Sequence, residues 1–202
     1  MTESICYVIC STPRSGSHFY AASLAATGIA GRPEDHFNPW GAGGRRGEAH
    51  DAEPKYDRKY VADIMAASNM TNGIFGTTVQ FNQIAGFVGF KTFEGMFPHA
   101  LKYLYLTRRD ILQQAVSLAI ARQTGQFQSG QPPAKQAQYN EDQIRCCLDD
   151  IINQERGWTR YFSERSIEPF RVFYEDLVTD TRKVVLETLE YLNICIPSNL
   201  TI

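Results

Sequence analysis

A loop near the start of the sequence combines hydroxyl side chains with one arginine and one glycine, a set suited to binding phosphate or sulfate. The apolar run before it, residues 5–9, is typical of a buried parallel strand, and the alanine-rich segment 19–26 is typical of a helix. The loop therefore opens a helix, where free backbone N–H groups, hydroxyls and a guanidinium can hold an anion. Its residues are Thr12, Pro13, Arg14, Ser15, Gly16, Ser17 and His18.

Two well-known phosphate loops do not match this one. A Walker A loop ends in Gly-Lys-Ser/Thr, whereas here no lysine precedes Ser17 and His18 follows it. A cysteine phosphatase wraps its loop around the phosphate from the thiolate, and Cys10 lies too close to Arg14 for such an arch. An ordinary capped strand-to-helix turn is the alternative that the loop alone leaves open.

Composition and charge narrow the class of protein. The 202 residues, 43% of them hydrophobic, suffice for one buried domain spanning 1–202. The net charge of −2 gives no overall attraction to nucleic acid, so none is expected as a partner, and any anion site must be built locally. No membrane span and no signal peptide are expected, which predicts a cytoplasmic protein. The five cysteines lack metal-ligand spacing, so no metal site is expected.

Strand and helix patterns alternate along the chain, which predicts an α/β fold: a single domain with a central parallel sheet flanked by helices. Segments 31–55 and 124–140, rich in glycine and proline or in glutamine, are expected to be long loops near the site, the second a mobile loop or lid. Strands are expected at 5–9, 73–80, 102–107 and 170–174, and helices at 19–26, 60–68, 111–123, 141–161 and 181–192.

A second cationic turn, Arg108-Arg109, follows the third expected strand. Ligands of parallel sheets bind beyond the C-terminal strand ends, so this turn and the first loop should lie at one edge. Two anion sites suggest a nucleotide phosphorylated at both its 5′ and 3′ positions. Ser117, on the next helix, could reach the phosphate that Arg108 or Arg109 grips. An arginine paired on the surface with Asp110 or Glu175 is the alternative.

The first long loop and the turn after the second strand carry side chains that could bind an acceptor. Aromatic rings there and at Phe127 could stack on a sugar or on adenine, and burial in the core is the alternative. The candidates are Glu34, Phe37, Trp40, Phe81, Asn82 and Gln83.

Several motifs together resemble those of sulfotransferases. Residues 11–17 resemble their 5′-phosphosulfate loop, Arg108-Arg109-Asp110 with Ser117 resembles their 3′-phosphate motif, and residues 173–177 resemble a late strand signature. The strongest resemblance is to the bacterial trehalose 2-sulfotransferase family, and nodulation-factor sulfotransferases are also similar, which leaves the acceptor open. The matching motifs are Thr27-Gly28-Ile29-Ala30-Gly31 with Pro33, Phe75-Gly76 with Asn82-Gln83, Gln114-Ala115-Val116-Ser117 with Gln123-Thr124, and Glu155-Arg156-Gly157-Trp158.

The resemblance implies a P-loop nucleotide-hydrolase-like sulfotransferase fold. It also implies in-line transfer of a sulfuryl group from 3′-phosphoadenosine 5′-phosphosulfate (PAPS) to a hydroxyl of a carbohydrate or other small acceptor, without a metal. Arg14 and the N–H groups of the loop would stabilise the charge on the departing phosphate. The resembled enzymes form dimers, so a homodimer is one expectation.

A base must take the proton from the attacking hydroxyl. In the trehalose enzymes a glutamate after the first helix does so, and aligning through residues 31–33 puts Asp35 at that position. His36 and Glu34 flank it, and the ordinary pKa of histidine, roughly 6.5, suits a general base better than the roughly 3.9 of aspartate. The catalytic candidates are Asp35, then His36, together with Arg14.

The chain departs from the family pattern at several points. Asp35 stands where the family has glutamate, Thr78 where it commonly has lysine, with Lys91 a candidate replacement cation, and the chain stops soon after the closing helix. Two alternatives therefore stay open. One is a P-loop-type nucleotide phosphotransferase, disfavoured by the missing Walker lysine, and the other is a catalytically silent nucleotide-binding homologue.

Overall fold

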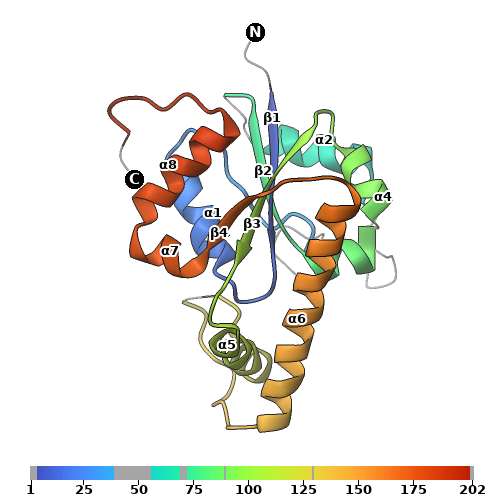
Figure 1. The fold of residues 1–202 in the computed structure, drawn as a ribbon, viewed down its shortest axis with the longest axis vertical. Coiled ribbons are helices and arrows are strands. Elements are labelled where there is room, and N and C mark those ends of the chain that lie inside the picture. Colours follow the sequence, from blue (N-terminus) through green and yellow to red (C-terminus); the bar gives the residue numbers. More distant parts are fainter. Residues whose placement is uncertain (1–3, 39–55, 69–71, 89, 129, 201–202) are drawn as a thin grey trace.

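Four strands form a parallel sheet at the centre of the protein, in the order β2-β1-β3-β4 (Figure 1). The structure is a computed structural model that describes residues 4–38, 56–68, 72–88, 90–128 and 130–200. Its strands are β1 (Ile5–Ser11), β2 (Ile74–Gln80), β3 (Leu101–Thr107) and β4 (Phe170–Phe173). All neighbouring strands run parallel, which confirms the predicted α/β fold with a central parallel sheet.

The register of the strands brings their C-terminal ends to one edge. Cys10 of β1 lies opposite Val79 of β2 on one side and Tyr105 of β3 on the other. The strands β1 and β2 end together at Ser11 and Gln80, and β3 ends two residues after Tyr105. The segments that follow these three strands therefore meet at the same edge, where ligands of such sheets bind.

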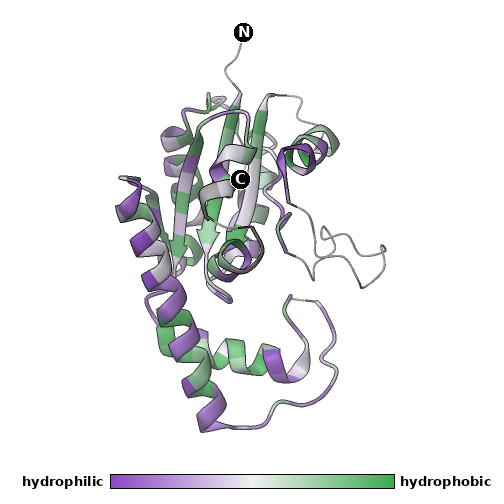
Figure 2. Ribbon diagram, turned by 90° about the vertical axis from the view of Figure 1, so that its right-hand side faces the viewer, coloured by the Kyte–Doolittle hydropathy of each residue, from purple (hydrophilic) through white to green (hydrophobic). Residues whose placement is uncertain are grey.

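Helices cover both faces of the sheet, and the hydrophobic residues gather between them and the strands (Figures 1 and 2). Alternate residues of β1 point to opposite faces, so Tyr7 and Ile9 enter one core while Val8 and Cys10 enter the other. One face is covered by α1 (Ser17–Ala26), α7 (Tyr174–Thr179) and α8 (Thr181–Leu192), and the other by α2 (Arg58–Ala67), α4 (Phe90–Phe93) and α6 (Glu141–Glu164).

The helix α5 (Ile111–Thr124) lies beyond the strand ends and packs on the first half of α6 (Figure 1). Small side chains on α5, among them Ala115 and Ala119, meet Cys147 and Ile151 of α6 in a separate apolar cluster. This packing holds α5 opposite the loop that follows β1.

All the helices and strands expected from the sequence are present, with ends that differ by a few residues. The described residues between α5 and α6 form no helix or strand, as expected for a loop. The short helix α7, directly after β4, was not predicted. Between β2 and β3 the described residues of the chain form four short helical turns, which are α3 (Phe81–Gln83), η1 (Ile84–Val88), α4 and η2 (Glu94–Met96).

The turn α3 packs on α6 at a position where only glycine fits. A Cβ atom on Gly157 would lie 2.1 Å from the ring of Phe81, well inside van der Waals contact. The same ring meets Trp158 edge to face, with centroids 5.5 Å apart. The absence of a side chain at Gly157 therefore sets how closely α3, and the end of β2 with it, approaches α6.

We expect Gly157→Ala to destabilise the protein by about 1–3 kcal/mol, because the overlap with Phe81 outweighs the better helix propensity of alanine. Urea unfolding followed by circular dichroism measures the change. Gly86→Ala is the matched control, since a Cβ there meets nothing within 4 Å. Equal stability of the two variants would contradict the packing described.

Candidate active site

The loop after β1 makes a left-handed turn and then starts α1. Arg14 has φ +64° and Gly16, which precedes the first residue of α1, has φ +95°. A Cβ atom on Gly16 would lie 2.4 Å from the ring of Tyr174, at the start of α7. The loop thus needs glycine at this position both for its backbone conformation and for the close approach of the Tyr174 ring.

Two side chains one turn apart on α5 hold this loop. Gln114, fully buried, donates from Nε2 to Thr12 Oγ1 (2.9 Å) and to the Pro13 carbonyl (2.7 Å). Ser117 Oγ accepts from Arg14 Nε at 3.0 Å. Because α5 is itself packed on α6, these contacts fix the left-handed turn and the direction of the arginine side chain.

A second cation lies close to Arg14. The Arg14 pKa is lowered, first by burial and then by the charge of Arg108, and the Tyr174 hydroxyl opposes these effects. The guanidinium of Arg14 also donates from Nη1 to the carbonyl of Phe127, in the loop after α5. The Arg14 guanidinium therefore donates to two neutral oxygens, Ser117 Oγ and the Phe127 carbonyl, and its positive charge is repelled by that of Arg108.

Arg108 lies over Tyr174, with its guanidinium carbon 4.7 Å from the ring centroid. It donates from Nη2 to Gln113 Oε1, while its Nε is buried and has no hydrogen-bond partner. Tyr174 thus contacts both Gly16 of the loop and Arg108. The sequence motif that contains Tyr174 did not predict this position beside the anion loop.

Arg109 is engaged elsewhere. Two hydrogen bonds of 2.7 Å join its guanidinium to the carboxylate of Asp176, and the guanidinium lies 4.1 Å from the Phe173 ring centroid. The surface ion pair expected for one arginine is therefore present, although its partner is Asp176 and not Asp110 or Glu175. The Glu175 carboxylate instead accepts from the backbone N–H of Arg109.

Buried polar atoms without partners gather around the loop. Among the described residues, they include Ser15 Oγ, Arg108 Nε and Gln114 Oε1. A hydroxyl and a guanidinium N–H can donate to a phosphate oxygen, so the first two fit an anion. Gln114 Oε1 is a hydrogen-bond acceptor and does not fit an anion. A buried donor left unpaired is costly, and each of these two donors would be satisfied by a phosphate oxygen.

Asp35 approaches the same region from the loop after α1. This segment lies alongside β2 and pairs with it in parallel, and the Thr78 N–H donates to the Glu34 carbonyl at 2.9 Å. Burial raises the Asp35 pKa, while hydrogen bonds from Gln83 and Asn38 and the charge of His18 oppose that rise. His18 lies in the first turn of α1, and its charge interacts with the Asp35 carboxylate.

The two ionisable neighbours of Asp35 point elsewhere. His36 is 8% exposed, its ring packs against Phe75, and Nδ1 lies 3.1 Å from Thr77 Oγ1. Burial lowers the His36 pKa. Glu34 is exposed and lies 3.9 Å from Arg32. The prediction that His36 could serve as base is therefore not supported, because its ring belongs to the core.

The predicted acceptor residues divide into three groups. Phe37 is 0% exposed and packs among core aromatic rings, which agrees with the alternative of burial in the core. Phe81 packs on α6 as described, and Gln83 is buried against Asp35, whereas Asn82 is exposed. Trp40 lies outside the described residues.

Thr78 stands where the family commonly has lysine. Its side chain is buried, and its hydroxyl donates to the Pro33 carbonyl at 3.4 Å. The Lys91 side chain lies outside the described part of the structure. No cation at either position is therefore assigned to the site.

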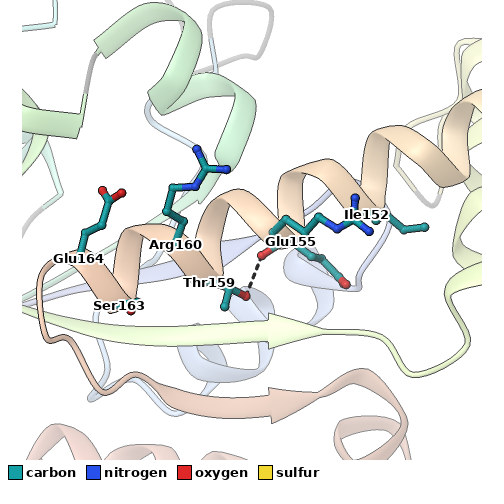
Figure 3. Close-up of a pocket in the computed structure, with 7 residues that line it drawn as sticks. Ile152, Glu155, Thr159, Arg160, Ser163 and Glu164 are labelled. Atoms are coloured by element: carbon teal, nitrogen blue, oxygen red, sulfur yellow. Dashed lines mark hydrogen bonds between the residues drawn. The ribbon is translucent and has the colours of Figure 1, made fainter.

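A hollow of about 520 Å³ along α6 does not form a second candidate. Figure 3 shows that Glu155 points toward the strands while Arg160 and Glu164 point to the other side of the helix. Its lining comes from this one helix and includes none of the predicted site residues. These side chains diverge and do not converge on one ligand.

Solved sulfotransferases share the fold. The sulfotransferase domain from the Synechococcus PCC 7002 olefin synthase has a TM-score of 0.51 at 18% identity, over 96% of this chain and 74% of that domain. Mouse sulfotransferase SULT7A1, solved with PAP, has a TM-score of 0.54 at 13% identity, over 97% of this chain and 61% of that protein. The chain thus spans less than two thirds of the mouse enzyme, and the fold is that of the sulfotransferases.

The model of the Stf0 sulphotransferase family matches residues 6–196, and the chain belongs to this family. The trehalose 2-sulfotransferase of Mycobacterium tuberculosis is 26% identical, over 91% of this chain and 82% of the relative. The trehalose 2-sulfotransferase of Mycolicibacterium smegmatis is 25% identical, over 92% of this chain and 83% of the relative. The predicted sulfotransferase family and activity class are confirmed, and the phosphotransferase alternative is not favoured.

Two further findings concern the described residues alone. None of their helices is both long and apolar enough to cross a bilayer. Their His, Cys, Asp and Glu side chains form no group of three or more that could hold a metal ion.

We expect Gly16→Ala to weaken binding of 3′-phosphoadenosine 5′-phosphate (PAP) at least about tenfold, because the methyl group meets Tyr174 and alanine is strained at this φ. Titration calorimetry measures the affinity. Gly28→Ala is the control, since Gly28 has φ +69° but a Cβ there meets nothing within 4 Å. Equal loss of affinity in both variants would point to general unfolding and contradict this role of Gly16.

Proposed function

We propose that this sulfotransferase transfers the sulfuryl group of PAPS to a hydroxyl of a sugar or another small acceptor. The observation that carries the proposal is the left-handed, arginine-bearing loop at the N-terminus of α1, which is bordered by Ser117 and Arg108. A half-buried carboxylate, Asp35, interacts with His18 in the first turn of the same helix. Transfer to a hydroxyl requires both cationic or N–H donors and a base, and these residues can supply them.

The loop fits the 5′-phosphosulfate of the donor. Its free donor groups are the unpaired Ser15 hydroxyl and the backbone N–H groups at the start of α1, and Arg14 adds a positive charge. When bound, PAPS supplies the sulfuryl group and leaves as PAP. Arg14 and the N–H groups, already oriented, would stabilise the charge that develops on the departing phosphate.

Arg108 and Ser117 fit the 3′-phosphate. Arg108 Nε is an unpaired buried donor, and the Ser117 hydroxyl lies beside the Arg14 guanidinium. Arg109, the other predicted ligand, is held by Asp176 and would have to leave that carboxylate to bind phosphate. We therefore propose Arg108 as the ligand, with Thr12, Pro13 and His18 shaping the loop and its border.

Asp35 fits the role of general base. Its carboxylate would accept the proton of the acceptor hydroxyl as the oxygen attacks sulfur. A raised pKa makes it a stronger base than an aspartate in solvent, which helps proton transfer near neutral pH. Glu34 and His36 are turned away, which leaves Asp35 as the favoured base of the three.

A sugar acceptor is proposed because two relatives are named trehalose 2-sulfotransferases. The exposed Asn82, on the turn that carries Gln83, can offer an amide to acceptor hydroxyls. A net charge of −2 gives no overall attraction to nucleic acid, so none is proposed as a partner. A cytoplasmic location and a homodimer stay predictions from the sequence.

We expect the protein to bind PAP in preference to ADP with magnesium, as measured by titration calorimetry. Arg14→Ala and Arg108→Ala should each weaken PAP binding by about 10- to 100-fold through loss of a charge-assisted hydrogen bond to phosphate. Arg145→Ala is the control, because Arg145 pairs with Glu141 on the surface of α6. A preference for magnesium-bound ADP would overturn the proposed donor.

We expect Asp35→Asn to lower kcat by about 10²- to 10⁴-fold and to leave PAP affinity unchanged, because the base does not hold the donor. In the unaltered protein, kcat/KM should fall as the pH drops through the Asp35 pKa, since the protonated carboxyl accepts no further proton. Transfer from labelled PAPS to a sugar panel measures both. Asp142→Asn, an exposed change on α6, is the control. Full activity of Asp35→Asn would exclude this base, and tight PAP binding without transfer would indicate the silent homologue.

A further inference from the structure

We propose that Gln83 is a positioning residue that orients the Asp35 carboxylate for proton removal, and not a ligand of the acceptor. This inference rests on the proposed function of Asp35. It is carried by the hydrogen bonds of one buried amide, which joins the end of β2 to the carboxylate.

The orientation of the Gln83 amide is determined by its surroundings. The side chain is 2% exposed, and its Oε1 accepts from the backbone N–H of Gln80 at 2.8 Å. Since a backbone N–H can only donate, the amide oxygen must face Gln80 and the amide nitrogen must face the other way. That nitrogen lies 3.2 Å from Asp35 Oδ1 and 3.5 Å from Oδ2.

Gln83 is the contact that ties the carboxylate to the sheet. The other amide on Asp35, Asn38 Nδ2 at 3.1 Å from Oδ2, comes from the same loop as Asp35 and moves with it. Gln80 is the last residue of β2, so the Gln83 amide links the carboxylate to a strand end. Without this link, the backbone of the loop stays paired with β2 but the Asp35 side chain gains rotational freedom.

The same framework also holds the anion loop. Trp158 of α6 donates from Nε1 to the Ser11 carbonyl at 2.8 Å, immediately before the loop. Its ring meets Phe81, which begins the turn that ends in Gln83. The donor loop and the base are therefore both attached to one packed unit. Fixing their separation in this way favours the near-attack geometry that an in-line transfer needs.

Charged and titratable groups surround Asp35 from other elements. His18 of α1 stabilises its ionised form, while Tyr56 interacts unfavourably with it. The Gln83 and Asn38 amides donate to the carboxylate and lower its pKa, against the effect of burial. Removing the Gln83 amide should therefore raise the Asp35 pKa, since a hydrogen bond to the ionised form is lost.

Two substitutions separate the contact with Asp35 from the contact with the strand. Gln83→Met removes both. Gln83→Glu keeps an oxygen that can accept from the Gln80 N–H, but it replaces the donor to Asp35 with a second carboxylate. Asn153→Ala, an exposed change on α6, is the control. Thermal unfolding of each variant reports whether the fold is retained.

The first readout is the titration of the Asp35 carboxyl carbon by NMR, assigned by its loss in Asp35→Asn. We expect its midpoint to rise by about one pH unit in Gln83→Met and by more in Gln83→Glu, where two carboxylates share a site. The acid limb of kcat/KM for sulfuryl transfer should move to higher pH by the same amount, with PAP affinity unchanged.

A purely structural role of Gln83 gives a different pattern. Gln83→Met would then lower the unfolding temperature, Gln83→Glu would behave as the unaltered protein, and neither would move the Asp35 titration. That result overturns the inference. A shifted titration in a protein that transfers no sulfuryl group would support the contact between Gln83 and Asp35 and overturn the proposed function alone.

Discussion

The left-handed turn at Arg14 is the constraint on which the site depends. A non-glycine residue in this conformation costs about 1–2 kcal/mol, so other contacts must hold it there. The buried Gln114 amide binds the two residues before Arg14, Ser117 binds its guanidinium, and the ring of Tyr174 lies against Gly16. Two separate elements, α5 and α7, both distant in sequence from it, therefore hold this short loop.

The local charge of the site differs from that of the whole chain. The net charge is −2, yet Arg14 and Arg108 lie close enough for one to lower the pKa of the other. Arg109 adds little to this positive charge, because Asp176 neutralises it. Two cations held near each other form a site that gains stability when an anion binds.

Much of the fold, and the residues proposed to bind the sulfuryl donor, could be predicted from the sequence because they are marked by local sequence patterns. The apolar run of β1, the hydroxyl-rich loop and the Arg108-Arg109 turn each follow from a few neighbouring residues. The acceptor side depends on contacts between distant segments. The surroundings of Asp35, His36 and Glu34 are decided by how residues 33–36 pair with β2, which no local pattern reveals.

The same difference between local patterns and distant contacts applies to the predicted acceptor residues Phe37 and Gln83. An aromatic residue in a glycine-rich loop suggests stacking on a ligand, but Phe37 packs against rings from α2 and α4 that lie far along the chain. Gln83 was predicted to bind substrate because it ends a strand at the ligand edge. Gln83 does lie just after the end of β2, but its contact with Asp35 depends on how the loop after α1 packs against β2.

The two halves of the site also differ in how they are held. The donor half is built from strand ends and the face of α5, with buried hydrogen bonds that tolerate little change. The base lies on a loop that pairs with the edge strand β2 and is joined to the sheet by one amide. Changes in that loop can alter which acceptor is bound without disturbing the donor loop.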